Sequence, residues 1–294
     1  MRPLLALLII VGLLPAQELR LAPPSDDTGF EYSGLAWHRD RLVLLPQYPE
    51  GSLPMLERAD LHQALCAPQP LHPRTIPFDD AKIRHQLDGY EGYEAIAFEG
   101  DRFYALVEGR LLFGGMRGYL VTGRADNTGI VAEACLPLPL PEDVSNYAFE
   151  ALTLGPEAVY VLYEANGIAE PPFAYAIARD LATVTKIPIA SIPFRVTDLT
   201  ALEGGRAWAL NTFWTGDRKK LQVQQRENFA QLLELEVGEG GIRPTGRTLE
   251  INRGEPSYNW EGIAAFEKGV IIITDTYPAT VMRYLELTPN TENP

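Results

Sequence analysis

Acidic side chains recur at two nearly fixed positions in five similar stretches of this 294-residue chain. Each stretch has an aromatic residue or Thr, a polar residue, an apolar segment, a turn and a second apolar segment. The polar residue is Ser33, Glu94, Glu150, Asp198 or Glu261. The second segment ends, thirteen or fourteen positions later, on Gln47, Glu108, Glu164, Asn211 or Asp275. Carboxylates repeated in this way can bind a cation or serve as general acids and bases.

Calcium suits these residue types best, because it takes six to eight oxygen ligands from carboxylates, amides and water. The predicted metal ligands are Glu94, Glu150, Asp198, Glu261 and Asp275. The predicted catalytic residues, as bases or ligands, are Glu150, Glu164 and Glu261. The four histidines fall outside the repeated positions, which disfavours a zinc site. A structural interpretation stays open, in which the acids cap turns and accept backbone N–H bonds.

The elements that would position these residues are paired strands. The five stretches begin 48 to 63 residues apart, a spacing typical of four-stranded propeller blades. Third strands are predicted near residues 55, 118, 173, 231 and 281, and fourth strands near 134 and 183. The last unit lacks a fourth strand, which "ELRLA" at 18 can supply. We therefore predict an all-β fold: a single β-propeller of five four-stranded blades closed by an N-terminal strand.

In such a fold the first strand of each blade lines a central channel, and the second runs antiparallel beside it. The start of one and the end of the other lie at the same rim, so the acids would form an inner and an outer ring. Two carboxylates ~7 Å apart repel by roughly 2 kcal/mol at an effective dielectric constant of about 20. A bound cation, protonation, arginine partners or a wider spacing must relieve that repulsion.

Loops at this rim supply candidate substrate-binding residues. The segment "TFWTGDRKKLQVQQRENF" at 212 is polar and basic in an acidic protein. Its Trp214, Arg218, Lys219 and Lys220, and Arg110 in the matching loop of the second copy, would meet a small anionic or ester substrate. A plain solvated loop is the alternative. The chain has no G-x-S-x-G elbow, P-loop or dinucleotide fingerprint.

Composition limits the partners and suggests a location. A net charge of −14 disfavours nucleic acid and anionic membranes. Residues 1–16 combine Arg2 with the apolar run Leu4–Leu14 and predict a signal peptide. A propeller over 17–288 and a polar tail over 289–294 would follow, in a monomer that is secreted or periplasmic. Apart from the signal segment no membrane contact is expected. Cys66 and Cys135 would form a disulfide or remain inert thiols.

Four motifs resemble the phytase-like propeller family known as "esterase-like activity of phytase". They are "YSGLAW", "NYAFEALTLGPEAVYVLYE", "VTDLTAL" and "NWEGIAAFEKGVIIITD". The resemblance covers nearly the whole mature chain and implies an exported propeller with acids around the channel mouth. It implies site roles for Glu94, Glu150, Asp198, Glu261, Glu164 and Asp275. The chain departs from the family pattern at Asn211 and directly after Asp275.

Two functions follow from this pattern. The first is a calcium-dependent hydrolase that acts on phosphate or carboxylic esters at the channel mouth. The second is a non-enzymatic propeller, braced by calcium, that binds a ligand or a protein.

Overall fold

The computed structural model describes residues 16–22, 31–112, 114–140, 146–165, 172–192, 194–221, 224–275 and 280–287. Nearly all regular structure in these ranges is β-strand. The predicted polar tail, and the predicted signal peptide except for Ala16, lie outside the described residues.

The strands form antiparallel runs of four in chain order. The first run is β2 (Tyr32–His38), β3 (Arg41–Pro46), β4 (Ser52–Glu57) and β5 (Arg74–Asp79). The second is β6 (Tyr90–Glu99), β7 (Arg102–Arg110), β8 (Met116–Ala125) and β9 (Ile130–Leu138). A short parallel pairing of β5 with β9 joins these two runs into one eight-stranded sheet.

Three four-stranded sheets complete the described structure. One contains β10 (Phe149–Leu154), β11 (Ala158–Tyr163), β12 (Phe173–Ala178) and β13 (Val184–Pro188). The next contains β14 (Arg195–Leu199), β15 (Arg206–Phe213), β16 (Phe229–Gly238) and β17 (Gly241–Arg253). The last contains β18 (Trp260–Phe266), β19 (Gly269–Thr274), β20 (Met282–Glu286) and β1 (Ala16–Leu19).

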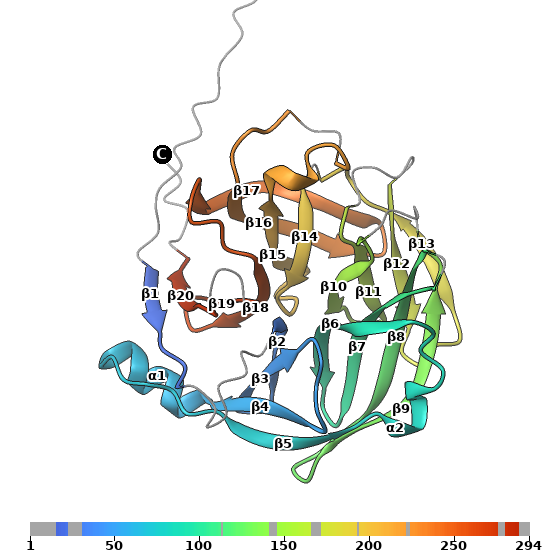
Figure 1. Ribbon diagram of the computed structural model, residues 1–294, viewed down its shortest axis with the longest axis horizontal. Coiled ribbons are helices and arrows are strands. Elements are labelled where there is room, and N and C mark those ends of the chain that lie inside the picture. Colours follow the sequence, from blue (N-terminus) through green and yellow to red (C-terminus); the bar gives the residue numbers. More distant parts are fainter. Residues whose placement is uncertain are drawn as a thin grey trace, which may run out of the picture.

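The first strands of the runs surround a common axis. In chain order β2 contacts β6, β6 contacts β10, β10 contacts β14 and β14 contacts β18, which returns to β2 (Figure 1). All five line one cavity of about 270 Å³ along this axis. This is the radial arrangement of a β-propeller, and it places the start of every inner strand at one mouth of the channel.

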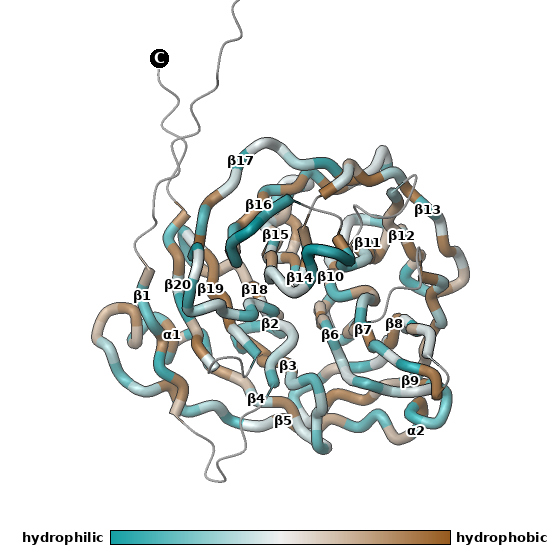
Figure 2. Tube along the Cα trace, turned by 45° about the horizontal axis from the view of Figure 1, so that its top comes forward, coloured by the Kyte–Doolittle hydropathy of each residue, from teal (hydrophilic) through white to brown (hydrophobic). Residues whose placement is uncertain are grey.

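Apolar packing between neighbouring sheets holds the ring together. One buried cluster combines Val43 and Leu45 of β3 with Phe103 and Val121 of the next run. Further clusters repeat this arrangement around the ring. The middle strands are buried on both faces and have almost continuous apolar sequences, whereas the outer strand β17 is half exposed and largely hydrophilic in Figure 2.

The chain closes the ring where the sequence predicts. β1 pairs antiparallel with β20, with Ala16 opposite Leu285 and Leu19 opposite Met282. This strand begins two residues before the predicted segment. Its pairing covers the edge of β20, which would otherwise be open to other chains.

One predicted strand is partly wrong. The third strand of the first run ends at Glu57, and residues Arg58–Cys66 form the helix α1. Leu61 and Ala64 lie one turn apart and bury the same helical face, which accounts for the helix. A one-turn helix, α2 (Ala81–Arg84), follows β5. No helix among the described residues is long and apolar enough to cross a membrane. Cys66 and Cys135 are free thiols.

Candidate functional site

A β-bulge near the start of each inner strand positions the inner ring of side chains. The pairing between inner and second strand skips one residue between Tyr32 and Gly34, and the same skip recurs in the other four runs. The skipped residues are Ser33, Glu94, Glu150, Thr197 and Glu261. A bulge re-aims the side chain it carries, and here it does so at the channel mouth.

The fourth copy therefore differs from the sequence prediction by one residue. Thr197, and not Asp198, occupies the inner-ring position. Its hydroxyl donates to the carbonyl of Trp260 at 2.7 Å, just as Ser33 donates to the carbonyl of Tyr93 at 2.5 Å. Two runs thus place a hydroxyl in the ring that fastens the next sheet, and three place a carboxyl group there.

Asp198 fills the position held by Gly34 and Gly262 in other copies, and its side chain contacts backbone N–H groups of the inner strands. Its carboxylate accepts the N–H of Ile263 at 2.9 Å and that of Leu199 at 2.8 Å. The N–H of Leu35 is a third donor to it. Asp198 thereby ties three inner strands together, so we remove it from the candidate metal ligands.

The outer ring needs the same correction. Asn211 lies opposite Val196, and Thr212 takes the position of Glu108 and Glu164. The amide of Asn211 donates to the carbonyl of Arg195 at 3.0 Å and accepts from Gln231 at 2.8 Å. It braces the sheet and is not an oxygen donor of the mouth.

Two carboxyl pairs occupy neighbouring runs at the mouth. Glu94 on β6 lies beside Glu108 on β7, and Glu150 on β10 lies beside Glu164 directly after β11. Oε1 of Glu108 and Oε2 of both Glu150 and Glu164 meet no donor among the described residues. The facing carboxylate adds to burial in raising the pKa of Glu94 and that of Glu150. Each pair therefore favours a state in which one of its two carboxyl groups carries a proton.

A third acidic pair belongs to the last run. Asn259 donates from one amide nitrogen to Glu261 and, at 2.9 Å, to Asp275. In the first run Gln47 takes the outer position and donates to Glu94 at 3.3 Å. All of the predicted inner-ring and outer-ring acids except Asp198 therefore lie at the same mouth. Amide side chains there donate hydrogen bonds to some of these acids and fix their positions.

Arg195 supplies the positive charge that the acidic cluster requires. Its Nε donates to Glu164, whose side chain is completely buried. Its Nη2 lies 3.5 Å from Glu150 and its Nη1 lies 4.0 Å from Asp217. Burial alone would lower the pKa of Arg195, but these carboxylates and Glu261 hold it above its usual value.

The search for repeats missed Arg195 because no other copy has an arginine there. Its equivalents two residues before the bulge include Gly92, Ala148 and Asn259. The available signal was the lone cation in "FRVTDL", directly before an inner strand of an acidic ring. Of the four ways of relieving the repulsion that the sequence left open, the structure shows an arginine partner, Arg195.

Burial shifts the acids toward their neutral forms. Burial, with nearby carboxylates, raises the pKa of Glu108 to about 7 and that of Glu261 to about 8. The pKa values of Glu94 and Glu150 lie well above the usual value for the same reasons. Burial also raises the pKa of Glu164, against the opposing effect of Arg195. At neutral pH the site therefore holds carboxylic acids and carboxylates side by side.

The ligand types at the mouth fit calcium, since carboxylate and amide oxygens surround the mouth and three of those oxygens meet no hydrogen-bond donor among the described residues. The carboxyl groups, however, are arranged in pairs. Within the described ranges no three His, Cys, Asp or Glu side chains are grouped to hold a metal ion. A cation at this site would compete with the protons of these pairs.

The predicted substrate-binding residues divide into two groups. Trp214 lies at the mouth, 54% exposed. Arg110 is paired with Glu91 at 2.8 Å and Asn146 at 2.5 Å, and Lys220 lies 3.9 Å from Asp217. Arg218 and Lys219 are exposed on the same loop. Of these side chains, Trp214 borders a defined cavity.

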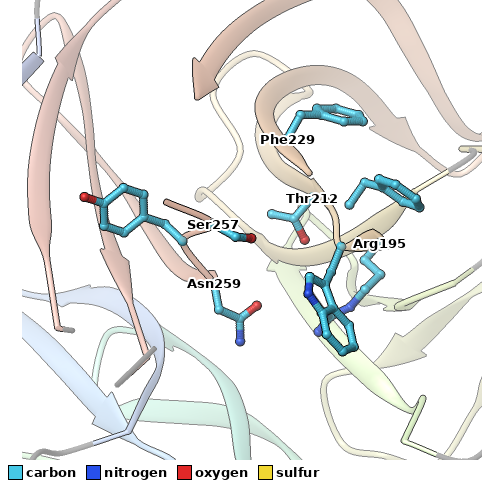
Figure 3. A pocket seen from close by; sticks show the side chains of 8 residues that line it. Arg195, Thr212, Phe229, Ser257 and Asn259 are labelled. Carbon is cyan, nitrogen blue, oxygen red and sulfur yellow. The ribbon is translucent and has the colours of Figure 1, made fainter. Parts of the chain in front are cut away.

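That cavity has a volume of about 310 Å³ and adjoins the acidic cluster. Its lining residues are Arg195, Thr212, Phe213, Trp214, Phe229, Ser257, Tyr258 and Asn259. Figure 3 shows Arg195, Thr212, Ser257 and Asn259 facing it from three sides, with Phe229 at its edge. Arg195 and Asn259 belong to the cavity and to the cluster, so a ligand here would reach the buried acids.

Comparisons with known proteins identify the fold alone. No family model and no curated protein matches the chain. Among solved structures, CoXyl43, a GH43 beta-xylosidase/alpha-arabinofuranosidase from a compost microbial metagenome, is 10% identical with a TM-score of 0.54, over 95% of this chain and 97% of that one.

Two further structures agree. RS223-Beta-xylosidase is 11% identical with a TM-score of 0.54, over 94% of this chain and 97% of that one. The phage phi92 endosialidase is 8% identical with a TM-score of 0.52, over 96% of this chain and 70% of that one. These neighbours are β-propeller enzymes, so the chain has a propeller fold.

Proposed function

We propose that this chain is a β-propeller hydrolase that cleaves carboxylic or phosphate esters at the acidic mouth of its channel. One observation carries the proposal: the buried carboxyl groups of Glu150 and Glu164 both face Arg195, next to a cavity of ligand size. Such a pair supplies a proton donor and a proton acceptor at the same pH.

The two acids have different roles. Glu164 is fully buried, and its bond to Arg195 favours its ionised form over that of Glu150, so Glu164 is the acceptor that holds the proton of Glu150 in position. Glu150 is slightly exposed and delivers that proton to the departing alkoxide. Glu261, with a pKa of about 8, is a second proton donor, and Glu108, with a pKa of about 7, is the group best poised to deprotonate water at neutral pH.

Calcium is the proposed metal at this mouth, with Glu94, Glu150, Glu261 and Asp275 as ionised ligands; it would displace the protons of Glu150 and Glu261, which act as proton donors only in the metal-free site. The oxygen-only donor set supports it, as does Oε2 of Glu150, which meets no donor among the described residues. When bound, the ion would polarise a phosphoryl or acyl oxygen. A phosphate ester needs such an ion more than a carboxylic ester does, because the acidic cluster repels an anionic substrate.

The proposal also covers the number of blades, the family and the location of the protein. We propose five blades, which is supported by five inner strands that each contact the next around the ring. The motifs quoted above support membership of the phytase-like propeller family. The apolar run after Arg2 supports a signal peptide and a secreted or periplasmic monomer.

The test is hydrolysis of aryl acetate, aryl phosphate and an aryl glycoside, each with calcium and with chelator. Aryl acetate turnover should fall 10²- to 10⁴-fold in Glu150→Gln, the range for loss of a general acid. The matched control is Glu133→Gln, an acid on the outer strand β9 paired with Arg124, which should retain full activity. Equal turnover in the two variants would remove the assignment.

Binding without catalysis is the second candidate function. Asp198, an inner-strand acid engaged only with backbone N–H groups, favours it by showing that acids brace this ring. It predicts a rise in melting temperature with calcium, without turnover of any of the three substrates. Turnover that depends on Glu150 would contradict it.

A further inference from the structure

The cavity beside Arg195, here the Trp214 cavity, has an aromatic and a polar part to its lining. The aromatic part consists of Phe213, Trp214, Phe229 and Tyr258. Its volume of about 310 Å³ exceeds the roughly 150 Å³ cavity that holds benzene in an engineered protein. A substituted aromatic ring therefore fits within it.

Trp214 is exposed yet held in one place. The 3-10 helix Thr215–Asp217 follows it, and the N–H of Asp217 donates to its carbonyl at 2.9 Å. Asn228 accepts the N–H of Thr215 at 2.7 Å. The indole ring lies so close to Gly216 that a Cβ atom there would overlap it. A large apolar side chain that is fixed in solvent contributes no burial energy to the folding of the chain itself. It contributes such energy when a ligand covers it, so the indole is suited to stack on a ligand.

The polar part of the lining contains donors that lack acceptors. Thr212 is 5% exposed, and its hydroxyl meets no partner among the described residues. Arg195 has five N–H donors, and its three acidic partners face one donor on each nitrogen. Further N–H groups therefore remain for a ligand. The missing group is an acceptor oxygen, and it is uncharged, because the neighbouring carboxylates disfavour an anion.

We propose that the Trp214 cavity binds the aromatic portion of an uncharged carboxylic ester, whose carbonyl oxygen accepts hydrogen bonds from Thr212 and Arg195. This placement sets the ester beside Glu150, so its consequence for turnover rests on the proposed function. The binding itself does not depend on it. The inference narrows the substrate class from esters in general to carboxylic esters with an aromatic group.

The experiment uses acetophenone, a ketone that resembles such an ester and cannot be hydrolysed, and ethylbenzene, which lacks the carbonyl. Binding is followed through the indole N–H signals of the ¹⁵N-labelled protein, assigned for Trp214 with Trp214→Phe. Trp37, Trp208 and Trp260 lie outside the cavity lining and serve as internal controls.

Acetophenone should shift the Trp214 signal saturably and bind about 25-fold more tightly than ethylbenzene, about fivefold for each of its two hydrogen bonds. Thr212→Val should reduce that preference about fivefold, to the part that Arg195 supplies, and leave ethylbenzene binding unchanged. Gly216→Ala, which displaces the indole, should weaken both ligands about tenfold. Tyr48→Ala removes another exposed aromatic residue outside the cavity lining and should change neither.

The inference is overturned if acetophenone leaves the Trp214 signal unmoved, or if Thr212→Val weakens both ligands equally. Failure of the proposed function has a different signature. If aryl acetate is not hydrolysed but acetophenone binds as described, the cavity stands and the hydrolase falls. If aryl acetate is hydrolysed through Glu150 without any acetophenone binding, the hydrolase stands and the subsite falls.

Discussion

Replacement of Arg195 by Met should destabilise the protein in a strongly pH-dependent way. Met keeps most of the buried aliphatic volume but removes the charge that faces Glu164, Glu150 and Asp217. Removing one partner of a buried ion pair costs about 3–5 kcal/mol, because the remaining charge stays buried. We expect this loss at pH 8.

At pH 5 the loss should shrink to about 1–2 kcal/mol. The pKa values of Glu150 and Glu164 are already raised by burial, and without Arg195 they rise further. At pH 5 both carboxyl groups then carry protons, so that only hydrogen bonds are lost. One extra proton held by the folded state changes the free energy of unfolding by about 1.4 kcal/mol per pH unit.

The assay is urea unfolding of both proteins in chelator at pH 5 and pH 8. Arg110→Met is the matched control, since Arg110 pairs with Glu91 at the same rim but is 39% exposed. It should cost less than about 1 kcal/mol at either pH. An Arg195→Met loss that is equal at the two pH values would refute the proposed role of the buried charge.

Two further predictions concern the acids themselves. In chelator, the free energy of unfolding of the unmodified protein should fall as pH rises from 4.5 to 8. Glu108 and Glu261, with pKa values of about 7 and 8, keep their protons in the folded state over much of this range, whereas the unfolded state releases them. A free energy of unfolding that stays constant or rises in urea titrations across this range would contradict the prediction. Asp198→Ala should lower the free energy of unfolding by about 2–4 kcal/mol in the same assay, because it leaves the buried N–H of Ile263 and that of Leu35 without an acceptor. Aryl acetate turnover per folded molecule should not change.

The repeated motif predicted the fold well because it reports on packing. An inner strand and a second strand with apolar faces, joined by a short turn, can bury those faces only by stacking against the next pair. The same regularity predicted that Glu94, Glu150 and Glu261 meet at one mouth, which the structure confirms. The pairing of the N-terminal strand followed from the last repeat, which had no fourth strand of its own.

The remainder depended on single residues. The register of the fourth copy turned on whether Val196 or Thr197 matched the aromatic position, and a bulge adds one residue without a sequence mark. Arg195 occurs in one copy alone, so regularity could not reveal it. The helix α1 replaced the second half of a predicted strand because alternation and helical spacing overlap in short apolar segments.

The pairing of β1 with β20 has a consequence for how the protein is made. β1 leaves the ribosome first among the described strands, and β20 leaves last. The sheet that closes the circle therefore cannot assemble before β20 has been synthesised. Until then the described strands form an open arc, and the step that locks it is an encounter between the first of these strands and the last.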